Sequence, residues 1–250
     1  MLLFKRVSLN GLDLFSGIGG ISIALSKWVR PIAYCEIDRY AQAVLLSRMH
    51  KGEISYAPIW DDVRTLRGEM LPSVDIISGG FPCQDISVAG HGVGLEGKRS
   101  GLFFQILRIS DELKPAFLFL ENVPAIRTRG AERVGKELAS RGYDCRWDVV
   151  PAAEVAAQFE GQRWFLAAAN RQALREQPWR GYGEGGQGQT LNTSASEPWL
   201  TSWTSQGGFK PRVSRTGNGI SFAVDRDRCL GNAVVPLQAR EAFKRLMGLT

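Results

Sequence analysis

The sequence is poor in the residues that bind metals or form disulfides. Its 250 residues include only two histidines and four cysteines. The cysteines are so widely spaced that neither a Cys-x-x-Cys pair nor a mixed Cys/His metal pattern occurs. We therefore expect no bound metal and no disulfide framework, which is typical of a reducing compartment.

Long hydrophobic runs are also absent. The first six residues, Met1 to Arg6, contain no apolar stretch long enough for a signal peptide, and no later run approaches the roughly 20 apolar residues of a membrane span. We expect a cytoplasmic, intracellular protein without membrane association that acts as a monomer.

Acidic residues are fewer than basic residues. The chain has 31 Lys and Arg against 25 Asp and Glu, a formal net charge of +6. Such a charge suits a polyanionic partner, because Lys and Arg neutralise phosphates and release counterions. Charge alone does not distinguish a nucleic-acid-binding protein from other basic proteins.

Alternating apolar and amphipathic runs in the first half indicate an α/β fold, a mostly parallel doubly wound sheet with helices on both faces. The predicted strands are 11–15, 31–35, a short one leading into Asp61, 74–78 and 116–120. The predicted helices are 18–29, 39–49, 102–113 and a last one ending at Met247. Segments 143–150 and 163–169 are expected to form antiparallel strands because their connection is short.

The composition changes between Asn170 and Arg215, where Gly, Ser and Thr are frequent and three tryptophans are scattered among arginines. One interpretation is an irregular surface loop, since this composition does not build a core. The other, which we favour, is a small recognition lobe that contacts nucleic acid by stacking and phosphate binding. We therefore divide the chain into a main domain, 1–169 and 216–250, and a lobe, 170–215.

A glycine-rich turn with Gly17, Gly19 and Gly20 joins the first strand to the first helix. Glycines there let a ligand approach the backbone, and a phosphate or dinucleotide site is the obvious competing interpretation. Glu36 ends the second strand, where a carboxylate can accept both ribose hydroxyls, and Asp62 follows the third, where it can accept from an adenine amino group. Together they predict an adenosine-bearing cofactor without specifying a phosphate.

Cys83 lies in the loop Gly79-Gly80-Phe81-Pro82-Cys83-Gln84, directly behind an apolar run. A cysteine is commonly a small buried hydrophobe, but ligands of open α/β sheets bind beyond strand ends such as this one. Glu121 ends the next strand, and no histidine is placed to support acyl transfer. A thiolate beside a carboxyl group suits addition to an electron-poor ring, with the carboxyl group protonating the ring nitrogen and Arg163 as a candidate for stabilising the thiolate.

Eight blocks, in order, resemble the DNA cytosine-5 methyltransferase family: DLFSGIGG, YCEID, DDV, GGFPCQDIS, GLFF, ENV, QRWF and GNAVVP. The resemblance covers the chain apart from 170–215. It implies a Rossmann-like S-adenosylmethionine-dependent methyltransferase fold, with S-adenosylmethionine as cofactor and a flipped cytosine in double-stranded DNA as substrate. The expected activity is that of a DNA (cytosine-5-)-methyltransferase of a restriction-modification system, with the catalytic domain in 1–169 and 216–250. The resemblance also implies a prokaryotic or phage-like source.

The resemblance also implies residue roles. Cys83 would attack C6 of cytosine, Glu121 would engage N3 and the exocyclic amine, and Arg163 would reach the flipped base. The implied cofactor-binding residues are Phe15, Gly17, Gly19, Gly20, Glu36, Ile37, Asp62, Val63, Pro82, Leu102, Asn232 and Val234. The implied DNA-binding residues are Gln84, Ser87, Lys98, Arg99, Arg212 and Arg215.

Two features depart from the family pattern. The family usually shows two arginines one residue apart where this chain has Gly161-Gln162-Arg163, so a phosphate contact is expected to be missing. The recognition region is short, which predicts a target site of about two to four base pairs at about 1 to 3 kcal/mol of discrimination per bidentate contact. The alternatives are a catalytically weakened DNA-binding relative and an RNA cytosine-5 methyltransferase.

Overall fold

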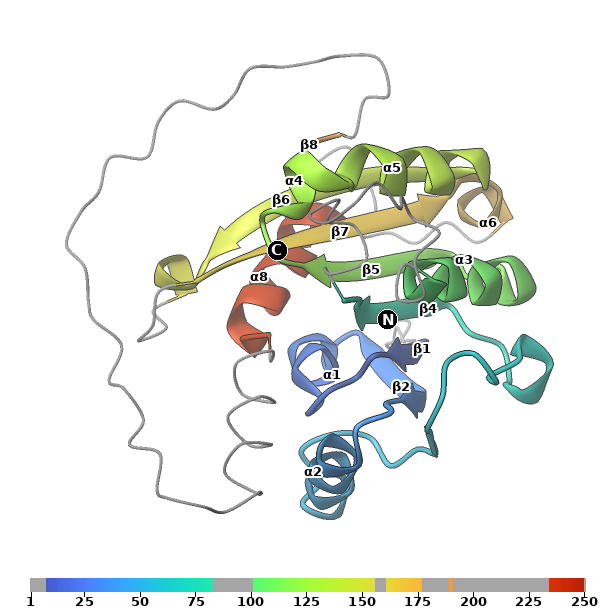
Figure 1. Cartoon of the computed structure of the whole chain (residues 1–250), viewed down its shortest axis with the longest axis vertical. Coiled ribbons are helices and arrows are strands. Elements are labelled where there is room, and N and C mark those ends of the chain that lie inside the picture. The colour runs from blue at the N-terminus through green and yellow to red at the C-terminus, as the bar shows by residue number, and fades with distance from the viewer. Residues whose placement is uncertain (1–7, 83–100, 156–160, 177–188, 191–233, 250) are drawn as a thin grey trace, which may run out of the picture.

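The computed structural model describes residues 8–82, 101–155, 161–176, 189–190 and 234–249. One sheet organises them, with strand order β3-β2-β1-β4-β5-β7-β6-β8 (Figure 1). The strands are β1 (Leu9–Leu14), β2 (Val29–Cys35), β3 (Ile59–Trp60), β4 (Ile76–Gly80), β5 (Phe117–Asn122), β6 (Tyr143–Pro151), β7 (Gln162–Asn170) and β8 (Gln189–Thr190). The helices are α1 (Gly20–Leu25), α2 (Arg39–His50), α3 (Gly101–Leu113), α4 (Ile126–Arg129), α5 (Ala131–Ser140), α6 (Arg171–Glu176) and α8 (Pro236–Met247), with short 3-10 turns η1 (Gly68–Met70) and η3 (Ala152–Val155).

The pairing directions match the doubly wound prediction. The strands β1 to β5 pair in parallel, and β7 pairs antiparallel with both β5 and β6. The expected antiparallel pair at 143–150 and 163–169 is therefore confirmed as β6 and β7. The predicted neighbourhood of the Cys83 and Glu121 strands is also confirmed, because β4 and β5 are adjacent and Gly80 lies opposite Glu121.

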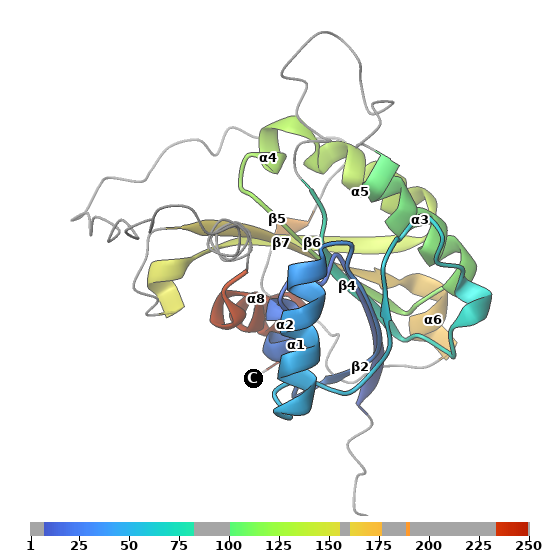
Figure 2. The ribbon, with the colours of Figure 1, turned by 60° about the horizontal axis from the view of Figure 1, so that its bottom comes forward.

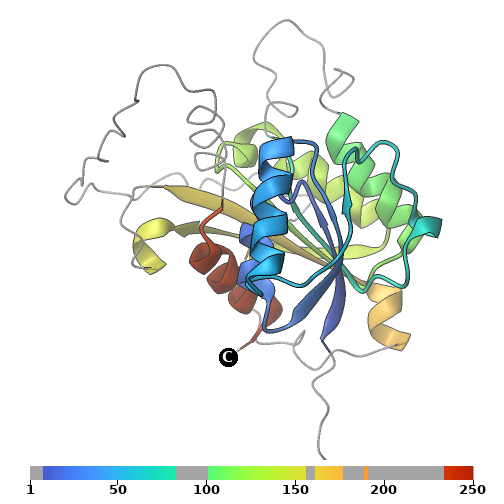
Figure 3. The ribbon, with the colours of Figure 1, turned by 90° about the horizontal axis from the view of Figure 1, so that it is seen from below.

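Side chains alternate between two apolar layers along the central strands. On β7, Trp164, Leu166 and Ala168 enter the layer beneath α3, α4 and α5, whereas Phe165 and Ala167 enter the layer beneath α1 and α8. Figure 2 shows these helix groups on opposite faces of the sheet, and in Figure 3 α8 lies beside α1. Period-two alternation on β7 thus places the sheet between two cores.

The structure also differs from the prediction in detail. The first helix spans only Gly20–Leu25 because a turn at Trp28, whose N–H donates to the Leu25 carbonyl, leads directly into β2. Strand β4 runs through both glycines that were predicted to be loop. The helices α4 and α5 were not predicted. No helix within the described ranges is both long and apolar enough to cross a membrane.

Candidate active site

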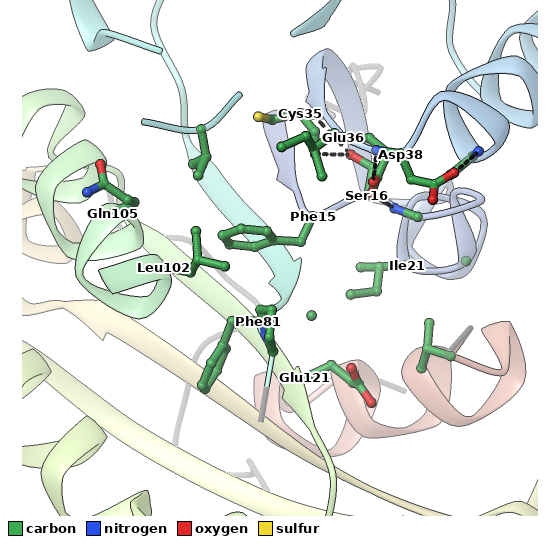
Figure 4. Close-up of a pocket in the computed structure, with 18 of the residues that line it drawn as sticks. Phe15, Ser16, Ile21, Cys35, Glu36, Asp38, Phe81, Leu102, Gln105 and Glu121 are labelled. Carbon is green, nitrogen blue, oxygen red and sulfur yellow. Dashed lines mark hydrogen bonds between the residues drawn. The ribbon is translucent and has the colours of Figure 1, made fainter. Parts of the chain in front are cut away.

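A cavity of about 660 Å³ lies at the carboxyl ends of β1, β2, β4 and β5 (Figure 4). Phe15 follows β1, Glu36 follows β2, Phe81 follows β4 and Glu121 lies at the end of β5, and all four line the cavity. Parallel strands end at the same edge of a sheet, so residues far apart in sequence meet there. This is the location predicted for ligand binding.

The glycine-rich turn forms one wall of the cavity. Gly17 and Gly19 have φ of 53° and 84°, a left-handed region that favours glycine, and Phe15 adopts the same region at 53°. A Cβ on Gly20 would lie 2.8 Å from the carbonyl oxygen of Val234, so glycine allows the segment before α8 to approach the turn. Local strain at Phe15 is typical of a functional site.

The Glu36 carboxylate is fixed by two backbone N–H groups, from Gly17 at 2.7 Å and from Asp38 at 2.8 Å. Asp38 in turn caps α2 by accepting from Tyr40 and Ala41. Between these two acids, Ile37 is 67% exposed at the cavity although it is a large apolar residue. An exposed apolar side chain beside a held carboxylate offers a ligand in the cavity both apolar contact and a hydrogen-bond acceptor.

Asp62 is held by its own neighbour. The Arg64 backbone N–H and Nε reach Asp62 Oδ1 at 2.9 Å, and Nη2 reaches Oδ2 at 2.6 Å. These hydrogen bonds lower the pKa of Asp62. The sequence analysis identified Asp62 but missed Arg64. The only feature of the sequence that could have indicated Arg64 is its position two residues after Asp62.

Glu121 and Arg163 form the other end of the cavity. Arg163 Nε lies 2.9 Å from Glu121 Oε1, joining β7 to β5. Burial raises the pKa of Glu121 to about 7, and the charge of Arg163 limits the rise. A Cβ on Gly80 would lie 2.7 Å from Glu121 Oε2, so the carboxyl group rests on a bare stretch of β4.

Asn122, which sequence reasoning counted only as part of a block, fixes the start of the Cys83 loop. Its Nδ2 donates to the Phe81 carbonyl at 2.9 Å, and its Oδ1 accepts from the N–H of Val123. The backbone that enters Pro82 is therefore tied to the strand that carries Glu121. The feature of the sequence that could have indicated Asn122 is its position directly after Glu121.

A second unpredicted group is Asp13, which is buried beneath the turn. Ser22 Oγ donates to Asp13 Oδ2 at 2.5 Å and Ser78 Oγ to Oδ1 at 3.0 Å. Burial raises the pKa of Asp13 to about 7, the two serine hydrogen bonds lower it, and the charge of Glu36 adds to the rise. The carboxyl group thereby joins β1, α1 and β4.

The two cysteines within the described ranges are buried and unsuited to nucleophilic attack. Cys35 forms part of the cavity wall and Cys145 lies on β6. Burial raises the pKa of each thiol to about 12, so both remain protonated near neutral pH.

The cavity brings together most of the candidate residues within the described ranges: Phe15, Gly17, Gly20, Glu36, Ile37, Asp62, Val63, Pro82, Leu102, Glu121, Arg163 and Val234. Gly19 belongs to the turn but packs toward Leu45. The other candidates lie outside the described residues: Cys83, Gln84, Ser87, Lys98, Arg99, Arg212, Arg215 and Asn232. Pro82, the residue before Cys83, is the last described residue of its segment and lines the cavity.

Several known proteins are similar to part of this chain. The chain is 36% identical over 167 residues to the type II methyltransferase M.CviJI of Paramecium bursaria Chlorella virus IL3A, covering 66% of this chain and 44% of the relative. It is 39% identical over 127 residues to M.HhaI of Haemophilus parahaemolyticus, covering 49% of this chain and 37% of the relative. The chain thus spans less than half the length of these relatives.

A solved structure supports the fold. The Dnmt2 methyltransferase of S. pombe matches with a TM-score of 0.54 and 21% identity, covering 65% of this chain and 51% of that chain. The family model described as C-5 cytosine-specific DNA methylase matches residues 9–196. The chain belongs to the C-5 cytosine-specific DNA methylase family.

Proposed function

We propose that this protein transfers a methyl group from S-adenosylmethionine to C5 of a flipped cytosine in duplex DNA, through a covalent bond between Cys83 and C6. The observation that carries the proposal is the buried Glu121 carboxyl group beside Arg163, placed next to the strand that leads into Pro82 and Cys83. Both groups share one cavity with the glycine-rich turn.

The cofactor end of the cavity fits an adenosine that carries no phosphate. Four carboxylate residues line it, Glu36, Asp38, Asp61 and Asp62, against one cation, Arg64, which is paired with Asp62, so the net charge of this end is negative. Such a concentration of negative charge disfavours a phosphate and therefore the dinucleotide alternative. It suits S-adenosylmethionine, which supplies an electrophilic methyl group on a positively charged sulfur.

The residues of this end have distinct binding roles in the proposal. Glu36 accepts from the ribose hydroxyls while Gly17 and Asp38 hold it in place. Asp62 accepts from the adenine amino group, and Val63 lines the cavity directly beside it. Phe15 and Ile37 provide apolar contact for the adenine.

The chemistry at the other end uses the near-neutral pKa of Glu121. The Cys83 thiolate forms a bond to C6 while Glu121, in its protonated form, gives its proton to N3, so the ring becomes electron-rich at C5. After C5 accepts the methyl group, with the sulfonium leaving as a neutral thioether, a water molecule takes the C5 proton, the bond between sulfur and C6 breaks to restore the thiolate, and N3 returns its proton to Glu121. The base leaves the stacked duplex to reach these groups, at a cost of about a few kcal/mol.

The proposal that DNA is the substrate rests on the basic composition of the chain and on its relatives, which are named type II methyltransferases. The lobe proposed at 170–215 begins with α6 and includes β8, which pairs with β6 at the sheet edge. The brevity of the region favours a target of about two to four base pairs. The carbonyl of Gly161, where the family's first arginine is absent, accepts from Ala152 and Gln238.

The test is incubation of the protein and its Cys83→Ser variant with labelled S-adenosylmethionine and, in separate reactions, random-sequence duplex DNA or tRNA. We expect label in C5 of cytosine with the unmodified protein only, and a covalent adduct with DNA containing 5-fluorocytosine, since fluorine does not leave as a proton does. Activity that survives in the variant overturns the nucleophile. Preferential labelling of tRNA supports the RNA alternative, and tight DNA binding without label supports the weakened relative.

A further inference from the structure

Arg108 on α3 connects this helix to the backbone of the cofactor end. Its Nη2 donates to the carbonyl of Val63 at 2.9 Å, across 45 residues of sequence. Val63 and the preceding Asp62 both line the cavity. The Arg108 guanidinium therefore binds the backbone of a segment that forms the cavity wall.

The same guanidinium orients a residue at the cavity. Arg108 Nε donates to Gln105 Oε1 at 2.8 Å, and Gln105 lines the cavity from α3, where Figure 4 labels it. Because the amide oxygen is engaged with Arg108, the amide N–H groups are left to face other partners. Arg108 therefore orients the Gln105 side chain without occupying its amide N–H groups.

Glu112 completes the brace one helical turn further along. Arg108 Nη1 donates to Glu112 Oε1 at 2.6 Å, and the N–H of Gly68 donates to Glu112 Oε2 at 2.6 Å. A Cβ on Gly68 would lie 2.9 Å from the Glu112 Cβ, so glycine allows this close approach. Burial alone would raise the pKa of Glu112, but the Gly68 and Arg108 hydrogen bonds lower it overall.

We propose that Arg108 is a positioning residue for the cofactor: through Val63, Gln105 and Glu112 it fixes the connection between β3 and β4 against α3 and so shapes the adenine end of the pocket. The inference rests on the proposed function, because it takes S-adenosylmethionine as the ligand. Loss of the guanidinium leaves the Val63 carbonyl without its side-chain donor and frees Gln105 to rotate, which weakens cofactor binding without removing any group that contacts the reacting atoms.

Arg141 provides a matched control. It also contacts α3, donating from Nε to Asp111 at 3.0 Å, and its Nη1 reaches Glu137 Oε2 at 2.9 Å on α5. Arg108 and Arg141 have similar side-chain exposure, 28% and 26%. Neither Arg141 nor its acid partners line the cavity, so Arg141→Met removes comparable ion pairs away from the cofactor.

The experiment is titration calorimetry of the full chain with S-adenosylhomocysteine, the demethylated product, comparing the unmodified protein, Arg108→Met and Arg141→Met. We expect Kd to rise about tenfold for Arg108→Met, the size of one lost charge-assisted hydrogen bond, and to stay within about twofold for Arg141→Met. Methylation assays should show a matching rise in KM for S-adenosylmethionine with kcat little changed.

Each result is decisive. Unchanged binding by folded Arg108→Met, or equal weakening by both variants, overturns the positioning role. If Arg108→Met fails to fold, Arg108→Lys is compared with Arg141→Lys. The positioning role then requires that only Arg108→Lys weakens binding of S-adenosylhomocysteine. Absence of binding by the unmodified protein overturns the proposed function and the role of Arg108 with it, whereas normal binding with an unaffected variant overturns the role alone.

Discussion

The protonation of Asp13 should make the stability of this protein depend on pH. Burial raises the pKa of Asp13 from the ordinary 3.8 to about 7 in the folded chain. Between these values the folded state binds a proton that the unfolded state has lost, so the contribution of Asp13 to the unfolding free energy is full below pH 3.8, is lost as pH rises to about 7, and changes little above that. Integrated from pH 5 to pH 8, this single group accounts for a loss of about 3 kcal/mol.

The perturbation that tests this is Asp13→Asn, which keeps the shape of the side chain and removes the titration. Ser78 Oγ can still donate to the remaining oxygen, and the new amide can donate to Ser22 Oγ. Glu121, whose pKa is also raised to about 7, titrates in both proteins and contributes the same loss to each. The variant should therefore lose about 3 kcal/mol less unfolding free energy than the unmodified protein over this pH interval.

Urea unfolding at pH 5, 6, 7 and 8 in constant salt provides the measurement. Ser78→Ala serves as a control of opposite sign, because the Ser78 hydrogen bond lowers the pKa of Asp13 and its removal should extend the loss to higher pH. Parallel pH profiles for Asp13→Asn and the unmodified protein would refute the reasoning, since they would show that burial does not keep Asp13 protonated.

Three further substitutions test the two ends of the cavity. Gly80→Ala places a methyl group 2.7 Å from the Glu121 carboxyl oxygen, so kcat for methyl transfer should fall about 100-fold while S-adenosylhomocysteine binding measured by calorimetry is retained. Glu121→Gln removes the proton donor, so kcat should fall about 100-fold or more and lose its pH dependence near 7, as a pH-rate profile would show. Glu36→Gln replaces one acceptor oxygen with a donor beside the Gly17 and Asp38 N–H groups, so Kd for S-adenosylhomocysteine should rise about tenfold in the same titration.

The residues at strand ends were predictable because their positions follow from local patterns. Apolar runs predicted the strands, and the acids Glu36, Asp62 and Glu121 stand where those runs stop. Parallel pairing then brings the strand ends to one edge of the sheet without further information. The carboxyl end of β4 was less predictable, because glycines normally indicate a loop. Only the pairing with β1 and β5 shows that Gly79 and Gly80 belong to the strand.

The supporting contacts could not be predicted, because each joins residues distant in sequence. Ser78 reaches Asp13 across 65 residues, and Asn122 reaches Phe81 across 41. Nothing in the local pattern around Asp13 distinguishes a buried carboxyl group from an exposed one. Arg64 is the exception, since it lies two residues from Asp62, but its choice of that carboxylate depends on the conformation of the turn.

The bare end of β4 explains why one cavity serves both halves of the proposed reaction. A Cβ on Gly79 would lie 2.4 Å from the Leu14 carbonyl on β1, and one on Gly80 would lie 2.7 Å from the Glu121 carboxyl group on β5. Side chains at these positions would separate the cofactor turn, which follows β1, from Glu121. With glycine at both, the two ends converge on the point where the chain enters Pro82, and the next residue is Cys83. The close approach of the cofactor turn to Glu121, which the proposed reaction requires, therefore depends on the absence of side chains at Gly79 and Gly80.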